Sequence, residues 1–205
     1  EAAEKAGFEH FMMKEIHEQP KAVRDTLNSV LVDGKLDMSA VGLSDEDIKK
    51  IDQICIVACG SAYHVGVAAQ YVIEDLAQIP VRTELASEFR YRKPLLSKNE
   101  LVIIVSQSGE TADSLAALRL AKEKGIKTLG IVNVVGSSIA READNVFYTL
   151  AGPEIAVATT KAYSTQLIAA YCLAIQFAIV RGTIDEAKYL ELIQEMAQLP
   201  DKIQK

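Results

Sequence analysis

The sequence predicts an α/β fold: a doubly wound, five-stranded parallel sheet with helical extensions at both ends. Short apolar segments rich in β-branched residues recur along the chain, and residues 101–105 are the clearest of them. Such uninterrupted apolar segments are typical of strands that are buried on both faces. Segments with helical spacing of apolar residues separate the strands. Strands that alternate with helices form βαβ units, and these units build a parallel sheet covered on both faces.

Length and composition support one globular α/β domain and exclude several classes of partner. The chain has 205 residues, of which 49% are hydrophobic, and its 22 basic and 28 acidic residues give a net charge of -6. Because the basic residues are few and dispersed, neither nucleic acid nor an anionic membrane is an expected partner. The three cysteines suggest no disulfide framework, the three histidines show no metal-ligand spacing, and no cofactor is expected.

No signal peptide is recognisable, and the longest apolar stretch, residues 167–180, is interrupted by Gln176 and is too short to span a bilayer. We therefore predict a cytoplasmic location. The chain begins with Glu1 rather than methionine and ends in a charged helix. These ends suggest a piece of a longer polypeptide.

The N-terminal part is expected to be a helical extension or linker, residues 1–45, in front of the α/β domain, residues 46–205. Apolar residues at helical spacing through residues 8–31 predict a helix that Pro20 divides or kinks. A turn is expected at residues 33–35. Ser44 is a candidate N-cap for an acidic first turn that leads to Ile51.

Within the α/β domain, five segments are expected to be strands: 53–58, 81–86, 101–105, 127–133 and 145–150. Five segments are expected to be helices: 62–76, 112–124, 137–143, 159–180 and 184–199. Gly125 is the expected stop signal of the second of these helices.

The turn at residues 106–111 (Ser-Gln-Ser-Gly-Glu-Thr) is the strongest candidate for a ligand site. In parallel sheets, ligands bind beyond the carboxyl ends of the strands. Hydroxyl groups and free backbone amides at the N-terminus of the next helix would stabilise a phosphate there, without help from a lysine or arginine inside the motif. An ordinary capped helix is the alternative interpretation.

Other segments have weaker candidate roles. The turn Cys59-Gly60-Ser61 is not a Gly-x-Gly-x-x-Gly motif, so a dinucleotide site is not expected. Cys59 could be a nucleophile with His64 as its base, or simply a small buried residue. Residues 154–161 could let a polyol approach the backbone, or could form a tight loop that ends in a threonine cap. Residues 88–93 are interpreted as a solvated basic connection or a subunit contact.

Three turns resemble those of the sugar isomerase (SIS) fold, which is flavodoxin-like: residues 58–61, 106–113 and 157–162. Three further stretches narrow the resemblance to the glutamine–fructose-6-phosphate aminotransferase family, also called glucosamine-6-phosphate synthase: residues 10–20, 86–92 and 133–138. The resemblance extends over nearly the whole chain. It implies the first of two tandem SIS domains, preceded in that family by a glutaminase domain.

The resemblance also implies which residues bind the sugar phosphate. Four residues would hold the phosphate of fructose 6-phosphate: Ser106, Gln107, Ser108 and Thr111. Six residues would line the sugar: Cys59, Gly60, Ser61, Val157, Ala158 and Thr159. Family members often carry Thr and then Ser after Cys-Gly, whereas this chain carries Ser61 and then Ala62, so one hydroxyl is missing.

In that family the groups that move protons lie in the second SIS domain and the C-terminal tail. The resemblance therefore implies a domain that binds sugar phosphate without catalysing its conversion to glucosamine 6-phosphate. Because SIS domains bury helical faces against one another and residues 165–180 are too apolar for a wholly exposed helix, we also expect a homodimer, through that helix or through residues 8–31. Two alternatives remain open from the residues. One is a sugar-phosphate-sensing module of a transcription regulator, and the other is a stand-alone phosphosugar isomerase.

Overall fold

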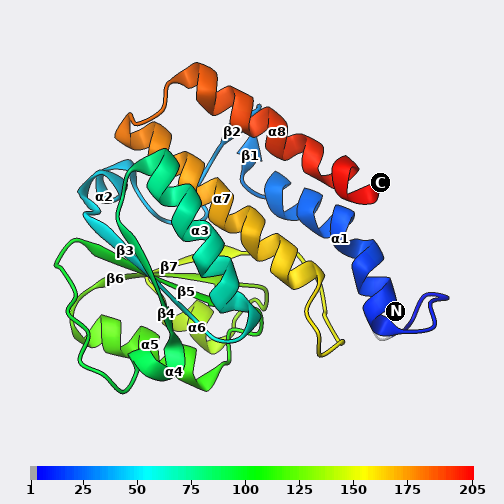
Figure 1. The fold of residues 1–205 in the computed structure, drawn as a ribbon, viewed down its shortest axis with the longest axis horizontal. Helices are drawn as coiled ribbons and strands as arrows, with labels where there is room; N and C mark the ends of the chain where they lie inside the picture. Colours follow the sequence, from blue (N-terminus) through cyan, green and yellow to red (C-terminus); the bar gives the residue numbers. More distant parts are fainter. Residues whose placement is uncertain (1–3) are drawn as a thin grey trace.

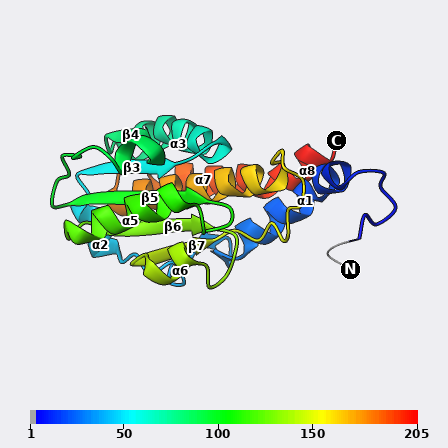
Figure 2. The same cartoon turned by 90° about the horizontal axis from the view of Figure 1, so that it is seen from below.

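A computed structural model describes residues 4–205 and confirms the five-stranded parallel sheet. The strands are β3 (Gln53–Ala58), β4 (Val81–Leu85), β5 (Glu100–Ser106), β6 (Lys127–Val132) and β7 (Asn145–Tyr148). They lie in the order β4-β3-β5-β6-β7, and each neighbouring pair is parallel (Figure 2). The chain order thus reverses beside β3 and β5, and their carboxyl ends flank the topological switch point at which ligands bind in such sheets.

Helices cover both faces of the sheet (Figure 1). Helices α3 (Ser61–Ala77) and α7 (Lys161–Arg181) pack on one face, and α4 (Ala86–Phe89), α5 (Ala112–Glu123) and α6 (Ser138–Glu142) on the other. Along β3, Ile54 and Ile56 belong to the first core, while Cys55 and Val57 belong to the second. This two-sided burial explains why the central strands carry consecutive apolar residues, as at positions 54–58 of β3 and 101–105 of β5.

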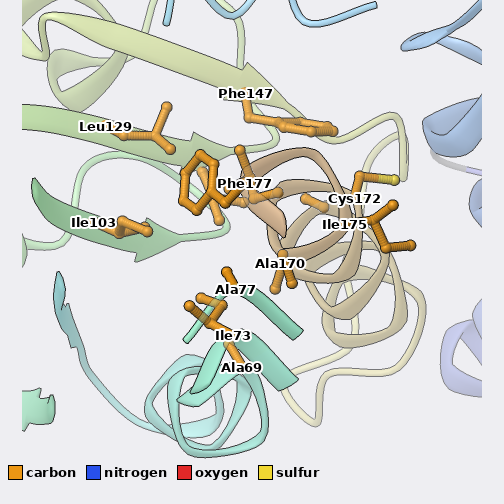
Figure 3. Packing of buried hydrophobic residues seen from close by; sticks show 14 of the residues in the cluster. Ala69, Ile73, Ala77, Ile103, Leu129, Phe147, Ala170, Cys172, Ile175 and Phe177 are labelled. Carbon is orange, nitrogen blue, oxygen red and sulfur yellow. The ribbon is translucent and has the colours of Figure 1, made fainter. Parts of the chain in front are cut away.

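The larger core lies between the sheet and the pair α3 and α7. Figure 3 shows Phe177 of α7 among strand residues such as Ile103 and Phe147, with Ile73 of α3 close by. Helix α7 is long and apolar enough to cross a membrane by length and composition, but it is mostly buried within this fold. Its apolar character is therefore accounted for by its place in the core.

The N-terminal segment forms α1 (Phe11–Asn28), which packs on α7 and on the C-terminal α8 (Glu186–Gln204). Helix α1 continues through Pro20, so division into two helices, one of the two predicted alternatives, is wrong, and a single kinked helix remains the other. A proline removes the hydrogen bond to the carbonyl four residues earlier, and here the side-chain amide of Gln19 donates to that carbonyl, of Ile16, at 3.2 Å. Helix α8 likewise continues through Pro200, beyond its expected end at residue 199.

The expected turn at residues 33–35 belongs to a small hairpin of β1 (Leu31–Val32) and β2 (Lys35–Leu36). Helix α2 (Asp45–Lys50) follows, and the Ser44 hydroxyl accepts a hydrogen bond from the Asp47 amide at 3.1 Å, which confirms the predicted N-cap.

The stretch at residues 88–93 is mostly exposed, as predicted for a solvated connection, but it is anchored to the protein by one buried residue and two ion pairs. Phe89 ends α4 and is completely buried in the second core. The two arginines that follow have ion-pair partners: Arg90 contacts Asp113 at 2.6 Å, and Arg92 pairs with Glu84. The aromatic residue thus anchors the stretch and the arginines tie it to α5 and β4.

Candidate functional site

A cavity of about 300 Å³ opens at the carboxyl edge of the sheet. It is formed by the turn after β3, the turn after β5, and the loop between β7 and α7. Its lining residues are Cys59, Ser61, Ala62, Val105, Ser106, Gln107, Ser108, Thr111, Glu154, Ala156, Val157, Thr159 and Gln166. All predicted site residues are in this set except Gly60 and Ala158, which lie in the same turn and loop without lining the cavity.

The turn after β5 is closed by its own hydroxyl groups. The Ser106 hydroxyl accepts a hydrogen bond from the Gly109 amide at 3.0 Å and lies 3.1 Å from the Thr111 hydroxyl. The Ser108 hydroxyl accepts from the Glu110 amide at 3.1 Å. Thr111 occupies the N-cap position of α5, but its side chain makes no capping bond. The simple capped-helix interpretation is therefore wrong for this turn.

The electrostatics at the start of α5 favour an anion. The first backbone amides of a helix have no carbonyl partner within the helix, and the helix dipole adds partial positive charge at this end. Among the described residues that line the cavity, none is basic. Hydroxyl and amide donors would therefore have to hold an anion there.

Glu110 lies in the same turn, but its side chain contacts the start of α6 and not the cavity. One of its carboxylate oxygens accepts a hydrogen bond from the Ser138 amide at 2.7 Å, at the start of α6. Hydrogen bonding to the side chain of Ser138, and then to its amide, lowers the pKa of Glu110 below its ordinary value. The carboxylate does not line the cavity, so it is a poor candidate for proton transfer to a ligand.

The turn after β3 does not assemble a nucleophile and a base. Cys59 lines the cavity with its sulfur 3.9 Å from the Ser114 hydroxyl. His64 is exposed, packs edge-on against Tyr63, and is not among the lining residues. The other thiol of this region, Cys55, is buried in β3, and burial raises its pKa to about 12. It therefore stays protonated at neutral pH.

The loop between β7 and α7, residues 151–160, is held by polar side chains. The Asn133 side chain accepts from the Ala151 amide at 2.9 Å and donates to the Gly152 carbonyl at 2.8 Å. The Glu154 carboxylate accepts from the amides of Thr160 and Ala162 at 3.1 and 3.0 Å. Glu154 thus caps α7, in place of the expected threonine cap.

Gln166 lines the cavity and is absent from the sequence prediction. It lies on α7 and is 4% exposed, and its side chain takes part in no hydrogen bond with residues 4–205. Gln166 stands in the second turn of α7, shortly after a candidate binding loop and directly before the apolar stretch that begins at Leu167. This position is the signal that could have identified it.

Comparisons with known proteins identify the family of this chain. The family model described as SIS domain matches residues 47–176. A glutamine–fructose-6-phosphate aminotransferase (isomerizing) from Caldanaerobacter subterraneus subsp. tengcongensis is 57% identical over 205 residues, which are 100% of this chain and 34% of that protein. A protein of the same name from Clostridium tetani is 55% identical over 206 residues, again 100% of this chain and 34% of that protein.

A solved structure is also similar, the C-terminal domain of a glucosamine–fructose-6-phosphate aminotransferase from Francisella tularensis. It superimposes with a TM-score of 0.93 at 40% sequence identity, over 97% of this chain and 56% of that one. This chain thus spans about a third of the length of the curated relatives it matches. Since the SIS family match covers well over half of its residues, the chain belongs to the SIS domain family.

Proposed function

We propose that this chain is the first SIS domain of a glutamine–fructose-6-phosphate aminotransferase and that its cavity binds fructose 6-phosphate. The observation that carries the proposal is the joining of two different surfaces in one cavity. One is the hydroxyl-lined turn at the N-terminus of α5, which suits a phosphate. The other is the small-residue loop before α7, which leaves room for a sugar. The cavity volume of about 300 Å³ is at the lower end for small-molecule sites.

In this proposal the phosphate contacts Ser106, Gln107, Ser108 and Thr111. The sugar lies against Cys59, Gly60 and Ser61 on one side and Val157, Ala158 and Thr159 on the other. Val157 is fully exposed in this chain, so it is available to a ligand or to a neighbouring domain.

The reaction of the whole enzyme needs more than this chain holds. The sugar ring opens, ammonia from a glutaminase domain condenses with the ketose carbonyl, and a proton moves between C1 and C2 to give glucosamine 6-phosphate. Such proton transfers need a carboxylate or another general base within reach of the sugar. Glu154 is the one carboxylate among the described lining residues, and its contacts to two backbone amides give it a structural task. We therefore place the catalytic groups in a second SIS domain of a longer, cytoplasmic protein.

Calorimetry tests the binding proposal. Ser108→Ala should weaken fructose 6-phosphate binding by about 1–2 kcal/mol, the range for a hydrogen bond to a charged group. Ser39→Ala is a matched control, because Ser39 is an exposed serine outside the cavity. Unchanged affinity in Ser108→Ala would refute the phosphate assignment.

A turnover assay tests whether this domain binds the substrate without catalysing the reaction. The chain mixed with fructose 6-phosphate and ammonia should form no glucosamine 6-phosphate, since a site that holds only the ground state gives affinity without rate. Turnover that survives repurification and is lost in Glu154→Gln would show that the catalytic groups are in this domain.

A further inference from the structure

Glu15 is a buried carboxylate on α1 that reaches the loop lining the cavity. Glu15 is about 140 positions before this loop in the sequence, and it is only 2% exposed. One carboxylate oxygen accepts hydrogen bonds from the amides of Ile155 and Ala156 at 2.6 and 3.2 Å, and the other accepts from Ala156 at 3.3 Å. Figure 1 shows this loop, in yellow, running between the end of β7 and α7 on the side where α1 lies.

These contacts hold the middle of the loop. Asn133 binds the start of the loop and Glu154 binds its end, but the amides of Ile155 and Ala156 donate to Glu15. A buried carboxylate requires such donors, because an unpaired charge in the protein interior is strongly unfavourable. The loop amides are less dependent on this contact, since Ile155 is 46% exposed and water can reach it, so loss of Glu15 should free the loop rather than unfold the chain.

Two neighbours on the same face of α1 extend the contact. Glu18 pairs with the buried Lys161 at 2.6 Å, and Gln19 accepts from the Ser164 hydroxyl at 2.6 Å. Positions 15, 18 and 19 are three and four residues apart, so they share one face of the helix. This face therefore contacts the loop and the first turn of α7 together.

We propose that Glu15 is a positioning residue for the sugar-binding part of the cavity, and that α1 thereby contributes to the ligand site. Ala156 lines the cavity, as do Val157 and Thr159, and the Ala156 amide donates a hydrogen bond to Glu15. Glu15 thereby fixes the position of the loop that forms this side of the cavity. The inference rests on the proposed function to the extent that this loop contacts the sugar.

Two variants of the 205-residue chain test the proposal, Glu15→Ala and Glu15→Gln, with Asp25→Ala and Asp25→Asn as matched controls. Asp25 lies on the same helix and pairs with the exposed Lys21. It lies near the start of the loop, at residues 151–153, but it accepts no hydrogen bond from Ile155 or Ala156, so its removal changes the same charge without removing an acceptor from these amides. The readouts are amide hydrogen exchange at Ile155 and Ala156, and calorimetric binding of fructose 6-phosphate and of inorganic phosphate.

In Glu15→Ala we expect both amides to exchange faster and fructose 6-phosphate to bind about tenfold more weakly, as the loss of hydrogen bonds to a charged group implies. Inorganic phosphate should bind as it does to the wild type, because the turn after β5 makes no contact with Glu15. In Glu15→Gln, the exchange rates and the fructose 6-phosphate affinity should lie between those of Glu15→Ala and the wild type, since glutamine retains one oxygen acceptor for these amides. The Asp25 variants should match the wild type.

Unchanged exchange and unchanged sugar-phosphate affinity in both Glu15 variants would overturn the proposal. Equal weakening of fructose 6-phosphate and inorganic phosphate would also overturn it, because it would indicate a general loss of structure. If Glu15→Ala failed to fold, Glu15→Gln would decide by the same readouts. If the wild type bound neither ligand, the proposed function would fail, and the exchange rates alone would decide whether Glu15 anchors the loop.

Discussion

The hydroxyl oxygens of Ser106 and Thr111 lie 3.1 Å apart across the turn that joins β5 to α5. Ser106 is the last residue of β5, and Thr111 directly precedes α5. Their contact folds the turn so that both residues, and Ser108 between them, line the same cavity. The contact also leaves the α5 amides without a side-chain cap, and these are the donors that a phosphate needs.

The shape of this turn depends on Gly109. Its φ of +67° is in the left-handed region, and a Cβ there would lie 2.0 Å from the Ser137 hydroxyl. Gly109→Ala should lower the free energy of unfolding by about 1–2 kcal/mol for the backbone conformation and by a further ~1–3 kcal/mol for the steric clash. Gly136→Ala is the control, because Gly136 has a φ of +74° and a Cβ added there would meet nothing within 4 Å, so only the backbone cost applies. Urea unfolding measures both, and equal losses in the two variants would contradict the close packing.

Gln166 should contribute to ligand affinity and not to stability. Gln166 lines the cavity, and its side chain takes part in no hydrogen bond with the described residues 4–205. Gln166→Leu should weaken fructose 6-phosphate binding by about 0.5–1.5 kcal/mol, the usual range for one hydrogen bond, and leave the free energy of unfolding unchanged or higher. Gln176→Leu, on the same helix outside the cavity, should change affinity little. An affinity loss of the same size in both variants would argue against a ligand contact by Gln166.

Asp144 should make stability depend on pH. Partial burial raises the pKa of this carboxylate, but hydrogen bonds from Lys122 and Thr128 outweigh that effect, and the net pKa is lowered. A carboxylate whose pKa is lower in the folded state stabilises the protein above the unfolded pKa, about 4, and loses that contribution as the pH falls through the folded value. Because the side chain is 40% exposed, solvent screening should keep the contribution below about 1 kcal/mol.

Urea unfolding of the wild type and of Asp144→Asn checks this. The stability difference between them should be present near neutral pH and shrink in acid. Asp75→Asn, which alters an exposed carboxylate on α3, should show no such change. A difference that stays constant down to acidic pH would rule out Asp144 as its source.

The chain should form a homodimer, through either of two apolar surfaces. One is the groove between α3, α7 and α8, whose lining includes Leu76 and Tyr171. The other is the exposed face of α1, which carries Met12 and Met13 at 42% and 47% exposure. Light scattering should report a dimer at high micromolar concentration, and a strict monomer would refute the prediction. Leu76→Glu and Met12→Glu separate the two surfaces, because only the variant on the true interface should dissociate.

Sequence alone predicted the strands and the candidate phosphate turn. Residues 101–105 read as a buried strand because a strand covered on both faces is apolar at every position. The turn at residues 106–111 could be assigned to the ligand edge because parallel strands bring their carboxyl ends to one side. Both inferences depend only on neighbours in the chain. Periodicity predicted the helix α1 but left open whether Pro20 divides or kinks it. The helix continues, and the side-chain amide of Gln19 donates to the carbonyl that Pro20 leaves free.

Tertiary structure decided which distant groups meet at the site. Phe89 is buried because α4 folds back onto the second core, and Glu154 caps α7 because the loop before it doubles back. The contact between Glu15 and Ile155 joins residues 140 positions apart. Sequence patterns report whether a side chain prefers burial, but they carry no information on which segment will cover it. The partner of a buried carboxylate is set only when helix and loop pack together and its charge must be satisfied.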